Sequence, residues 1–164
     1  MIKLIVFDVD GCLTDGGIIY GGSDEEYKVF NVKDGFVIVS LAKLGYKSAI
    51  ITGRASKVVE RRSKELKIDY LYQGVKDKKA TLDEILKKEK LTLENVAAIG
   101  DDINDLKLLK SIAWSFAPND AMDLVKQNVT SVLKLGGGKG AVREMIDLIF
   151  EKEGKKEEFL KLWL

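Results

Sequence analysis

Apolar and polar residues follow one another in blocks that predict buried strands separated by amphipathic helices. The first block, Leu4–Phe7, is a continuous apolar run that leads directly into Asp8. A run of this kind, bounded by glycine, is typical of a strand covered on both faces, as in the centre of a parallel sheet. Further strands are predicted at 47–51, 70–72, 96–99, 112–116 and near Val132.

Segments with helical spacing of apolar residues separate these strands. They predict helices at 34–44, 56–66 and 77–88, short helices ending at Leu109 and around 122–125, and a helix at 141–150 after a glycine-rich loop, 136–140. Strands that alternate with helices in this way form βαβ units. The sequence therefore predicts an α/β fold, a doubly wound, Rossmann-like and mostly parallel sheet with helices on both faces, in a single domain spanning 1–164.

Two segments fall outside this alternation. Residues 18–20 and 27–32 are β-prone runs around a Gly-Gly-Ser-Asp cluster, which predicts a projecting hairpin at about 18–32. Both runs are apolar on both faces, which favours contact with another subunit, with packing on the same domain as the alternative. The tail, about 151–164, ends in apolar residues that are expected either to dock on a neighbour or to fray.

Composition narrows the chemistry available to the chain. The net charge of +1 creates no field that favours nucleic acid, and no apolar run reaches the length of a membrane span, so neither partner is expected. The first residues predict a strand rather than a signal peptide, and the single cysteine, Cys12, fits a reducing compartment, so we expect a cytoplasmic protein. The absence of histidine excludes Ser-His-Asp and Cys-His catalysis and any zinc site built on imidazole.

Chemical groups follow the predicted strands at the positions where they end. Asp8 and Asp10 follow the first strand, Thr52 the second and Asp101 the strand at 96–99, while Lys78 opens a helix. The carboxyl ends of parallel strands share one edge of the sheet, so these groups are expected to converge. Carboxylates, a hydroxyl and an ammonium group fit phosphoryl transfer with Mg²⁺.

Each of these residues also has an ordinary structural interpretation. Asp-Val-Asp-Gly is a common turn sequence, Thr52 is a plausible helix N-cap, and Lys78 taken alone is a solvated lysine at a helix start. Cys12 fits packing better than chemistry. The loop at 136–140 is ordinarily the start of a helix, although its amides and Lys139 offer donors to an anion.

Four segments in this order resemble a known superfamily. FDVDGCLTDGG, ITGR, the lysine of KDKK and IGDDINDL are similar to the four motifs of the haloacid dehalogenase superfamily of phosphohydrolases. FNVKDG, LYQGVKDK and GGGKGAVRE are similar to the 3-deoxy-D-manno-octulosonate 8-phosphate (KDO 8-phosphate) phosphatases within it. The resemblance runs from about Leu4 to Phe150.

This resemblance implies specific roles. Asp8 is expected to attack phosphorus and form an aspartyl-phosphate, with Asp10 as general acid and then base. Thr52 and Lys78 are expected to bind the phosphoryl group. The expected Mg²⁺ ligands are Asp8, the backbone carbonyl of Asp10, and Asp101, supported from behind by Asp102 and Asp105. The residues expected to contact the substrate are Asp10, Asn31, Val32, Lys33, Asp34, Gly35, Arg54, Arg62 and Lys78.

The spacing leaves no room for a cap domain over the site. The stretch from Asp8 to Thr52 is filled by the hairpin and a helix, and the stretch from Thr52 to Lys78 by a helix and a strand. The related phosphatases are tetramers whose neighbouring subunits cover the site, so the resemblance implies a homotetramer.

The function implied is Mg²⁺-dependent hydrolysis of a small phosphorylated sugar acid, KDO 8-phosphate, in lipopolysaccharide biosynthesis. Some relatives carry a basic residue where this chain has Val39, which keeps a phosphatase for a nine-carbon sugar acid as an alternative. A non-catalytic phosphate-binding oligomer is a second alternative. A signalling receiver domain fits less well, because its acceptor aspartate lies on a later strand than its acidic pair. The lack of G-x-G-x-x-G after the first strand speaks against a sugar-nucleotide dehydrogenase.

Overall fold

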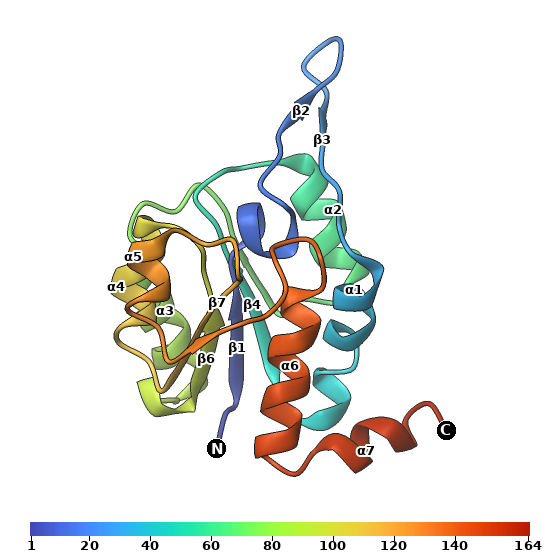
Figure 1. Ribbon diagram of the computed structural model, residues 1–164, viewed down its shortest axis with the longest axis vertical. Coiled ribbons are helices and arrows are strands. Elements are labelled where there is room, and N and C mark those ends of the chain that lie inside the picture. Colours follow the sequence, from blue (N-terminus) through green and yellow to red (C-terminus); the bar gives the residue numbers. More distant parts are fainter.

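The computed structural model describes residues 1–164, and its centre is a six-stranded parallel sheet (Figure 1). The strands are β1 (Leu4–Phe7), β4 (Lys47–Ile51), β5 (Tyr70–Tyr72), β6 (Val96–Ile99), β7 (Trp114–Ala117) and β8 (Ser131–Val132). Their order is β5-β4-β1-β6-β7-β8. This is the strand order of a doubly wound sheet, and the winding direction reverses between β1 and β6. The predicted fold class is confirmed.

Strand β1 is hydrogen-bonded on both sides and covered on both faces, which explains its unbroken apolar run. Leu4 pairs in register with Lys47 of β4 and with Val96 of β6. Because successive side chains of a strand point to opposite faces, Ile5 and Phe7 belong to one buried cluster and Leu4 and Val6 to the other.

The helices divide between the two faces of the sheet (Figure 1). One face packs against α1 (Val32–Ile38), α2 (Lys57–Glu65) and α6 (Ala141–Lys152). The other packs against α3 (Lys78–Glu89), α4 (Leu106–Leu109) and α5 (Asp123–Lys126). No helix is long and apolar enough to cross a membrane.

Several predicted boundaries were wrong. The segment expected to be one helix over 34–44 is α1 followed by a separate 3-10 turn, Ala42–Leu44. The strand expected at 112–116 begins two residues later, at Trp114, because Ser111 and Ile112 still belong to the turn after α4. The strands at 47–51, 70–72 and 96–99 lie where they were predicted.

The hairpin is present but its strands are shorter than predicted. Strands β2 (Ile19–Tyr20) and β3 (Glu26–Tyr27) pair antiparallel and project beyond the carboxyl edge of the sheet (Figure 1). The boundary predicted at residue 32 was wrong, because Asn31 accepts a hydrogen bond from the amide of Lys33 and so starts α1 at Val32.

The tail forms a helix and does not fray. Helix α6 continues to Lys152, beyond the predicted start of the tail, and α7 (Lys156–Lys161) runs from the lower end of α6 away from the sheet, on the side of α1 (Figure 1). Phe159 is buried, with its ring 6.3 Å from that of Phe36 in α1 and 5.3 Å from that of Phe150 in α6. Trp163 stacks on Phe36 at 4.4 Å. Phe159 is therefore covered by its own chain, whereas Leu160, Trp163 and Leu164 stay exposed.

Candidate active site

A polar pocket of about 280 Å³ lies at the carboxyl edge of the sheet, where β1, β4 and β6 end. The polarity follows from the topology, since this edge flanks the point at which the winding reverses. The pocket is lined by Asp8, Asp10, Gly16, Thr52, Gly53, Arg54, Asp101, Asp102 and Asn104. The pocket therefore brings together six of the residues predicted from the sequence, namely Asp8, Asp10, Thr52, Arg54, Asp101 and Asp102.

Lys78 lies beneath this pocket and holds two carboxylates. Its ammonium group is 2.8 Å from Oδ1 of Asp8 and 2.5 Å from Oδ1 of Asp105, and all three side chains are buried. The helix start that places Lys78 is fixed by Asp77, whose side chain accepts a hydrogen bond from the amide of Ala80. The two carboxylates raise the pKa of Lys78 even though burial opposes this, so it stays charged.

Asp105 connects Lys78 to the loop that follows β6. Its Oδ2 accepts hydrogen bonds from the amides of Asp101 at 3.0 Å and of Asp102 at 3.3 Å, while Oδ1 faces Lys78. Gly100 is needed here, since a Cβ on it would lie 2.5 Å from the Asp105 carboxyl carbon. Asp105 therefore fixes the loop that carries Asp101, from a position outside the pocket.

Asp8 and Asp101 face each other with too little positive charge between them. Burial, and then the charge of Asp105, raise the pKa of Asp8 to about 6, although Lys78 opposes the rise. Burial, and then the charge of Asp8, raise the pKa of Asp101 to about 8. Two carboxylates that repel each other in this way are the expected signature of a site for a hard divalent cation, so the residues present fit Mg²⁺.

The turn after β1 brings its backbone against Asp101. Gly11 has a φ of 87°, and a Cβ there would lie 2.0 Å from Oδ2 of Asp101, so only glycine fits. Cys12 lies under the same turn, and its sulfur and the carboxylates of Asp8 and Asp101 all lie within 4.8 Å of one another. Complete burial, followed by the charges of Asp8 and Asp101, raises the pKa of the thiol well above its usual value, so it stays protonated.

Thr52 is not the N-cap that its position allowed. Ser56 caps α2 by accepting a hydrogen bond from the amide of Val58. The backbone of Thr52 donates a hydrogen bond to the carbonyl of Tyr72, at the end of β5, and accepts one from the amide of Val75 in the loop that follows. Thr52 thus lines the pocket without a capping role.

Asp10 has a partner that the sequence analysis missed. Lys28 reaches from the hairpin to place its ammonium group 2.5 Å from Oδ1 of Asp10 and 2.9 Å from Oε1 of Glu26. Arg54 completes the cluster, 4.0 Å from Oδ2 of Asp10 and 3.7 Å from Oε2 of Glu26. The only hint in the sequence is that Glu26 and Lys28 are two positions apart and so share a face of an extended chain.

The predicted substrate residues of the first helix lie outside this pocket. Asn31 donates to the carbonyl of Gly138, and the buried carboxylate of Asp34 accepts from the amide of Arg143 at 2.8 Å. The exposed side chains of Val32 and Lys33 do not line the pocket of Asp8 either. Gly35 is packed against the guanidinium of Arg62.

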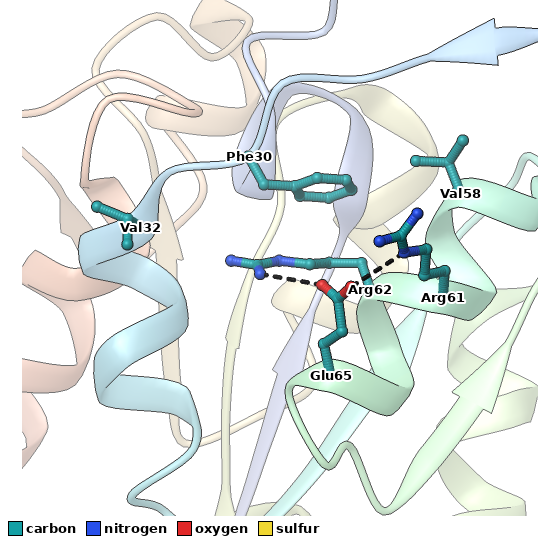
Figure 2. Close-up of a pocket in the computed structure, with 6 residues that line it drawn as sticks. All are labelled: Phe30, Val32, Val58, Arg61, Arg62 and Glu65. Atoms are coloured by element: carbon teal, nitrogen blue, oxygen red, sulfur yellow. Dashed lines mark hydrogen bonds and ion pairs between the residues drawn. The ribbon is translucent and has the colours of Figure 1, made fainter.

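Arg62 lines a separate hollow of about 390 Å³, which shares no lining residue with the pocket of Asp8 (Figure 2). Its guanidinium lies 5.4 Å from the ring of Phe30, and its Nη1 is 3.4 Å from Oε2 of Glu65. Val32 and Val58 form the opposite walls. In this chain, therefore, Arg54 lies in the pocket of Asp8 whereas Arg62 does not.

The glycine-rich loop supports the turn after β1. The amide of Gly138 donates to the carbonyl of Cys12 at 3.0 Å, and that of Gly137 donates to Asp120. A Cβ on Gly137 would lie 2.0 Å from the carbonyl oxygen of Gly11. These two amides are thus occupied within the protein, which favours a packing role for the loop over an anion site.

Comparison with known proteins agrees with this geometry. A family of haloacid dehalogenase-like hydrolases matches residues 70–145. The KDO 8-phosphate phosphatase of Escherichia coli K12 is 41% identical over 157 residues, which cover 96% of this chain and 84% of that enzyme. The chain belongs to the KDO 8-phosphate phosphatase family. It is accordingly a phosphomonoester hydrolase of the haloacid dehalogenase-like class.

Solved structures of this family superpose closely. The Moraxella catarrhalis enzyme, in complex with magnesium, phosphate and KDO, matches with a TM-score of 0.96 and 37% identity over 99% of this chain and 94% of that chain. A cobalt-bound enzyme from Haemophilus influenzae matches with a TM-score of 0.90 and 40% identity over 94% of this chain and 90% of that one.

Proposed function

We propose that this chain is a Mg²⁺-dependent phosphatase that hydrolyses KDO 8-phosphate to KDO and phosphate through an aspartyl-phosphate. The observation that carries the proposal is the pocket in which Asp8 is held by Lys78 and faces Asp101, in a chain similar to an enzyme that binds magnesium, phosphate and KDO. The proposal further assigns the reaction to lipopolysaccharide biosynthesis, the pathway inferred from the sequence resemblance.

In the first step, a carboxylate oxygen of Asp8 attacks the phosphorus atom of the substrate. The bond from phosphorus to the ester oxygen breaks, its electron pair passes to the sugar oxygen, and the Asp10 carboxyl group donates the proton that makes this oxygen a hydroxyl. The products are the free sugar acid and an acyl phosphate on Asp8. Asp8 is a suitable nucleophile above pH 6, where it is ionised.

In the second step, water attacks the phosphorus atom of the acyl phosphate. Asp10, now a carboxylate, takes a proton from the water, and the bond from phosphorus to the Asp8 oxygen breaks. Inorganic phosphate leaves, and both aspartates return to their starting states. The same residue serves as acid and then as base, so no histidine is required.

Three further residues support the phosphoryl group. Lys78 places its positive charge beside the attacked group and offsets the charge that the phosphate brings. The Thr52 hydroxyl, at the end of β4, is free to donate to a phosphoryl oxygen. Asp105 keeps Lys78 and the Asp101 loop in place.

The cation site fits the same arrangement. Asp8, the backbone carbonyl of Asp10, and Asp101 would hold Mg²⁺, which when bound neutralises carboxylate and phosphate charge. The opposed carboxylates of Asp8 and Asp101 support this assignment. Cys12, protonated and below the turn, is not needed as a ligand.

The first experiment measures phosphate release from KDO 8-phosphate by the purified protein, with Mg²⁺ and with excess EDTA. A panel of other sugar phosphates, including a nine-carbon sugar acid 9-phosphate, runs beside it. Fast release that requires Mg²⁺ and is specific to KDO 8-phosphate is the expected result. A preference for the nine-carbon acid would replace the substrate, and no release from any compound would refute the enzymatic proposal.

The nucleophile is tested with Asp8→Asn, which keeps the shape of the side chain and removes its nucleophilic oxygen. Turnover is expected to fall by at least about 10³-fold while the circular dichroism spectrum stays unchanged. Asp15→Asn, an exposed position in the same loop, is the matched control and is expected to keep activity. Retained turnover in Asp8→Asn would overturn the assignment of the nucleophile.

We also propose that the active form is a homotetramer in which neighbouring subunits cover the pocket. The hairpin supports this, because it projects from the sheet with its large apolar side chains in water, including Tyr20, which is 72% exposed, and Val29, which is 66% exposed. Light scattering after size-exclusion chromatography is expected to give four times the chain mass. A monomer that is fully active at assay concentration would contradict the proposal.

A further inference from the structure

The carboxyl group of Asp10 is held from outside its own loop. Asp10 lies in the irregular turn after β1, and neither of its carboxylate oxygens receives a hydrogen bond from that turn. The charged groups that reach it are Lys28, at 2.5 Å, and Arg54, at 4.0 Å. Asp8 differs, because its carboxylate is fixed from below by buried Lys78.

The surroundings of Lys28 hold its ammonium group against Asp10. Its side chain is 0% exposed although it sits on a projecting hairpin, so its ammonium group has exchanged water for carboxylate partners. Glu26 holds the same nitrogen at 2.9 Å from the other side. Lys28 follows β3 directly, and its two-residue offset from Glu26 keeps both side chains on the same face of the extended chain, where Lys28 reaches Asp10.

Arg54 cannot replace Lys28 in this role. Its nearest approach to Asp10 is at the limit of an ion pair, and its side chain is 43% exposed and shared with Glu26. A partly exposed guanidinium at this distance restricts a carboxylate far less than a buried ammonium group at hydrogen-bond distance.

We propose that Lys28 is a positioning residue that fixes the Asp10 carboxyl group at the point where the sugar oxygen leaves phosphorus. The inference rests on the proposed function, in which Asp10 donates that proton. The hairpin would then have a role in catalysis as well as in assembly, because it carries Lys28, which positions the general acid Asp10. Glu26 in turn positions Lys28.

This role predicts which reactions depend on Lys28. A sugar alkoxide is a poor leaving group and needs the proton from Asp10 as its bond to phosphorus breaks. A 4-nitrophenolate departs readily without that proton. The ratio kcat/KM reports the steps through departure of the leaving group. If the Asp10 carboxyl group is misplaced, kcat/KM should therefore fall strongly for the sugar phosphate and only slightly for the aryl phosphate.

The experiment compares the native protein with Lys28→Met, Lys28→Arg and Glu26→Gln, with Mg²⁺ present. Lys110→Met, an exposed lysine in no ion pair, is the matched control. The substrates are KDO 8-phosphate and a series of aryl phosphates whose leaving groups span a wide range of pKa. Circular dichroism and light scattering verify that each variant is folded and assembled as the native protein is.

For Lys28→Met, kcat/KM for KDO 8-phosphate is expected to fall roughly 30-fold or more, part of the 10²–10⁴ that acid catalysis supplies, against less than about 3-fold for 4-nitrophenyl phosphate. The dependence on leaving-group pKa should steepen. Lys28→Arg is expected to restore part of the loss, and Glu26→Gln to give a smaller loss of the same kind.

Equal losses for both substrates, or no loss, in a folded Lys28→Met would overturn the positioning role while leaving the proposed function in place. If Lys28→Met does not fold, the decision moves to Glu26→Gln, where an unchanged leaving-group dependence overturns the inference. A native protein without activity on any of these substrates refutes the proposed function, and the inference with it.

Discussion

Replacing Lys78 by Met removes the single cation that two buried carboxylates share. In the native chain its ammonium group lies 2.8 Å from Asp8 and 2.5 Å from Asp105, and Lys78 itself is 3% exposed. Met has a similar length and is apolar, so packing is largely kept and the loss is electrostatic. Breaking a buried ion pair by removing one partner costs about 3–5 kcal/mol, and we expect a loss of that size at pH 7.5.

The loss should depend on pH in a defined direction. The pKa of Asp8 is already raised to about 6 by burial and by Asp105, and Lys78 is the group that opposes this rise. In Lys78→Met the folded-state pKa of Asp8 therefore lies higher still, above its unfolded value. A carboxyl group of this kind destabilises the fold increasingly as the pH rises from its unfolded to its folded pKa, and the cost is complete above the folded pKa. The deficit should therefore shrink between pH 7.5 and pH 5.

The assay is urea unfolding followed by the fluorescence of Trp114 and Trp163. With a slope of about 2 kcal/mol per molar urea, the expected loss moves the midpoint down by roughly 2 M at pH 7.5. The control is Lys79→Met at the next position, whose partner Asp83 is largely exposed and whose ion pair is worth about 0.5 kcal/mol.

The reasoning is refuted if Lys78→Met and Lys79→Met shift the midpoint equally. A large shift in Lys78→Met that does not change between pH 7.5 and pH 5 would show that the loss comes from packing and not from unpaired charge.

Three further changes test other parts of the fold. Burial raises the pKa of Asp34 from 3.8 to about 6, so the ionised carboxylate lowers the stability of the fold increasingly from pH 4 to pH 7. The free energy of unfolding of Asp34→Asn should therefore gain up to about 3 kcal/mol relative to the native chain over that range. Urea unfolding at each pH measures this difference. Gly137→Ala drives a Cβ into the carbonyl of Gly11, and its turnover should fall at least about 10-fold in phosphate-release assays, whereas unchanged turnover would show that the loop yields. Phe159→Ala should lower the free energy of unfolding by about 3–4 kcal/mol with native kcat; a loss under 1 kcal/mol would mean that α7 is not docked.

Much of the fold could be predicted because its strands are buried on both faces. The run at 96–99 has no polar residue to satisfy, so only a central strand suits it, and the strand was predicted at its observed position. Residues 34–44 were misread as one helix because helical spacing continues through Ser40, while Gly45, with a φ of 83°, closes a tighter 3-10 turn. The position of α7 depends on contacts with Phe36, far away in the sequence.

The candidate site, like the fold, could be predicted from the sequence only in part. Asp8, Thr52 and Asp101 could be brought together in advance, because parallel strands end at one edge. Lys28 could not, because its partner Asp10 belongs to a separate segment and nothing local distinguishes a buried lysine from a solvated one. The roles of Asn31–Gly35 and Arg62 toward the substrate stay predictions, since their side chains lie outside the pocket of Asp8 in this chain.

The central position of β1 has a consequence for the order in which the protein can be made. Leu4 pairs with Lys47 of β4 on one side and with Val96 of β6 on the other. The second edge of β1, the first strand to be synthesised, is therefore covered only after β6 has been made. Such long-range parallel pairing folds slowly and leaves an apolar edge open in the meantime. Asp8 follows β1 directly, and Asp101 follows β6, the second strand that pairs with β1. A nascent chain therefore has no catalytic pocket until the sheet has closed around β1, and enzymatic activity should report the completion of folding.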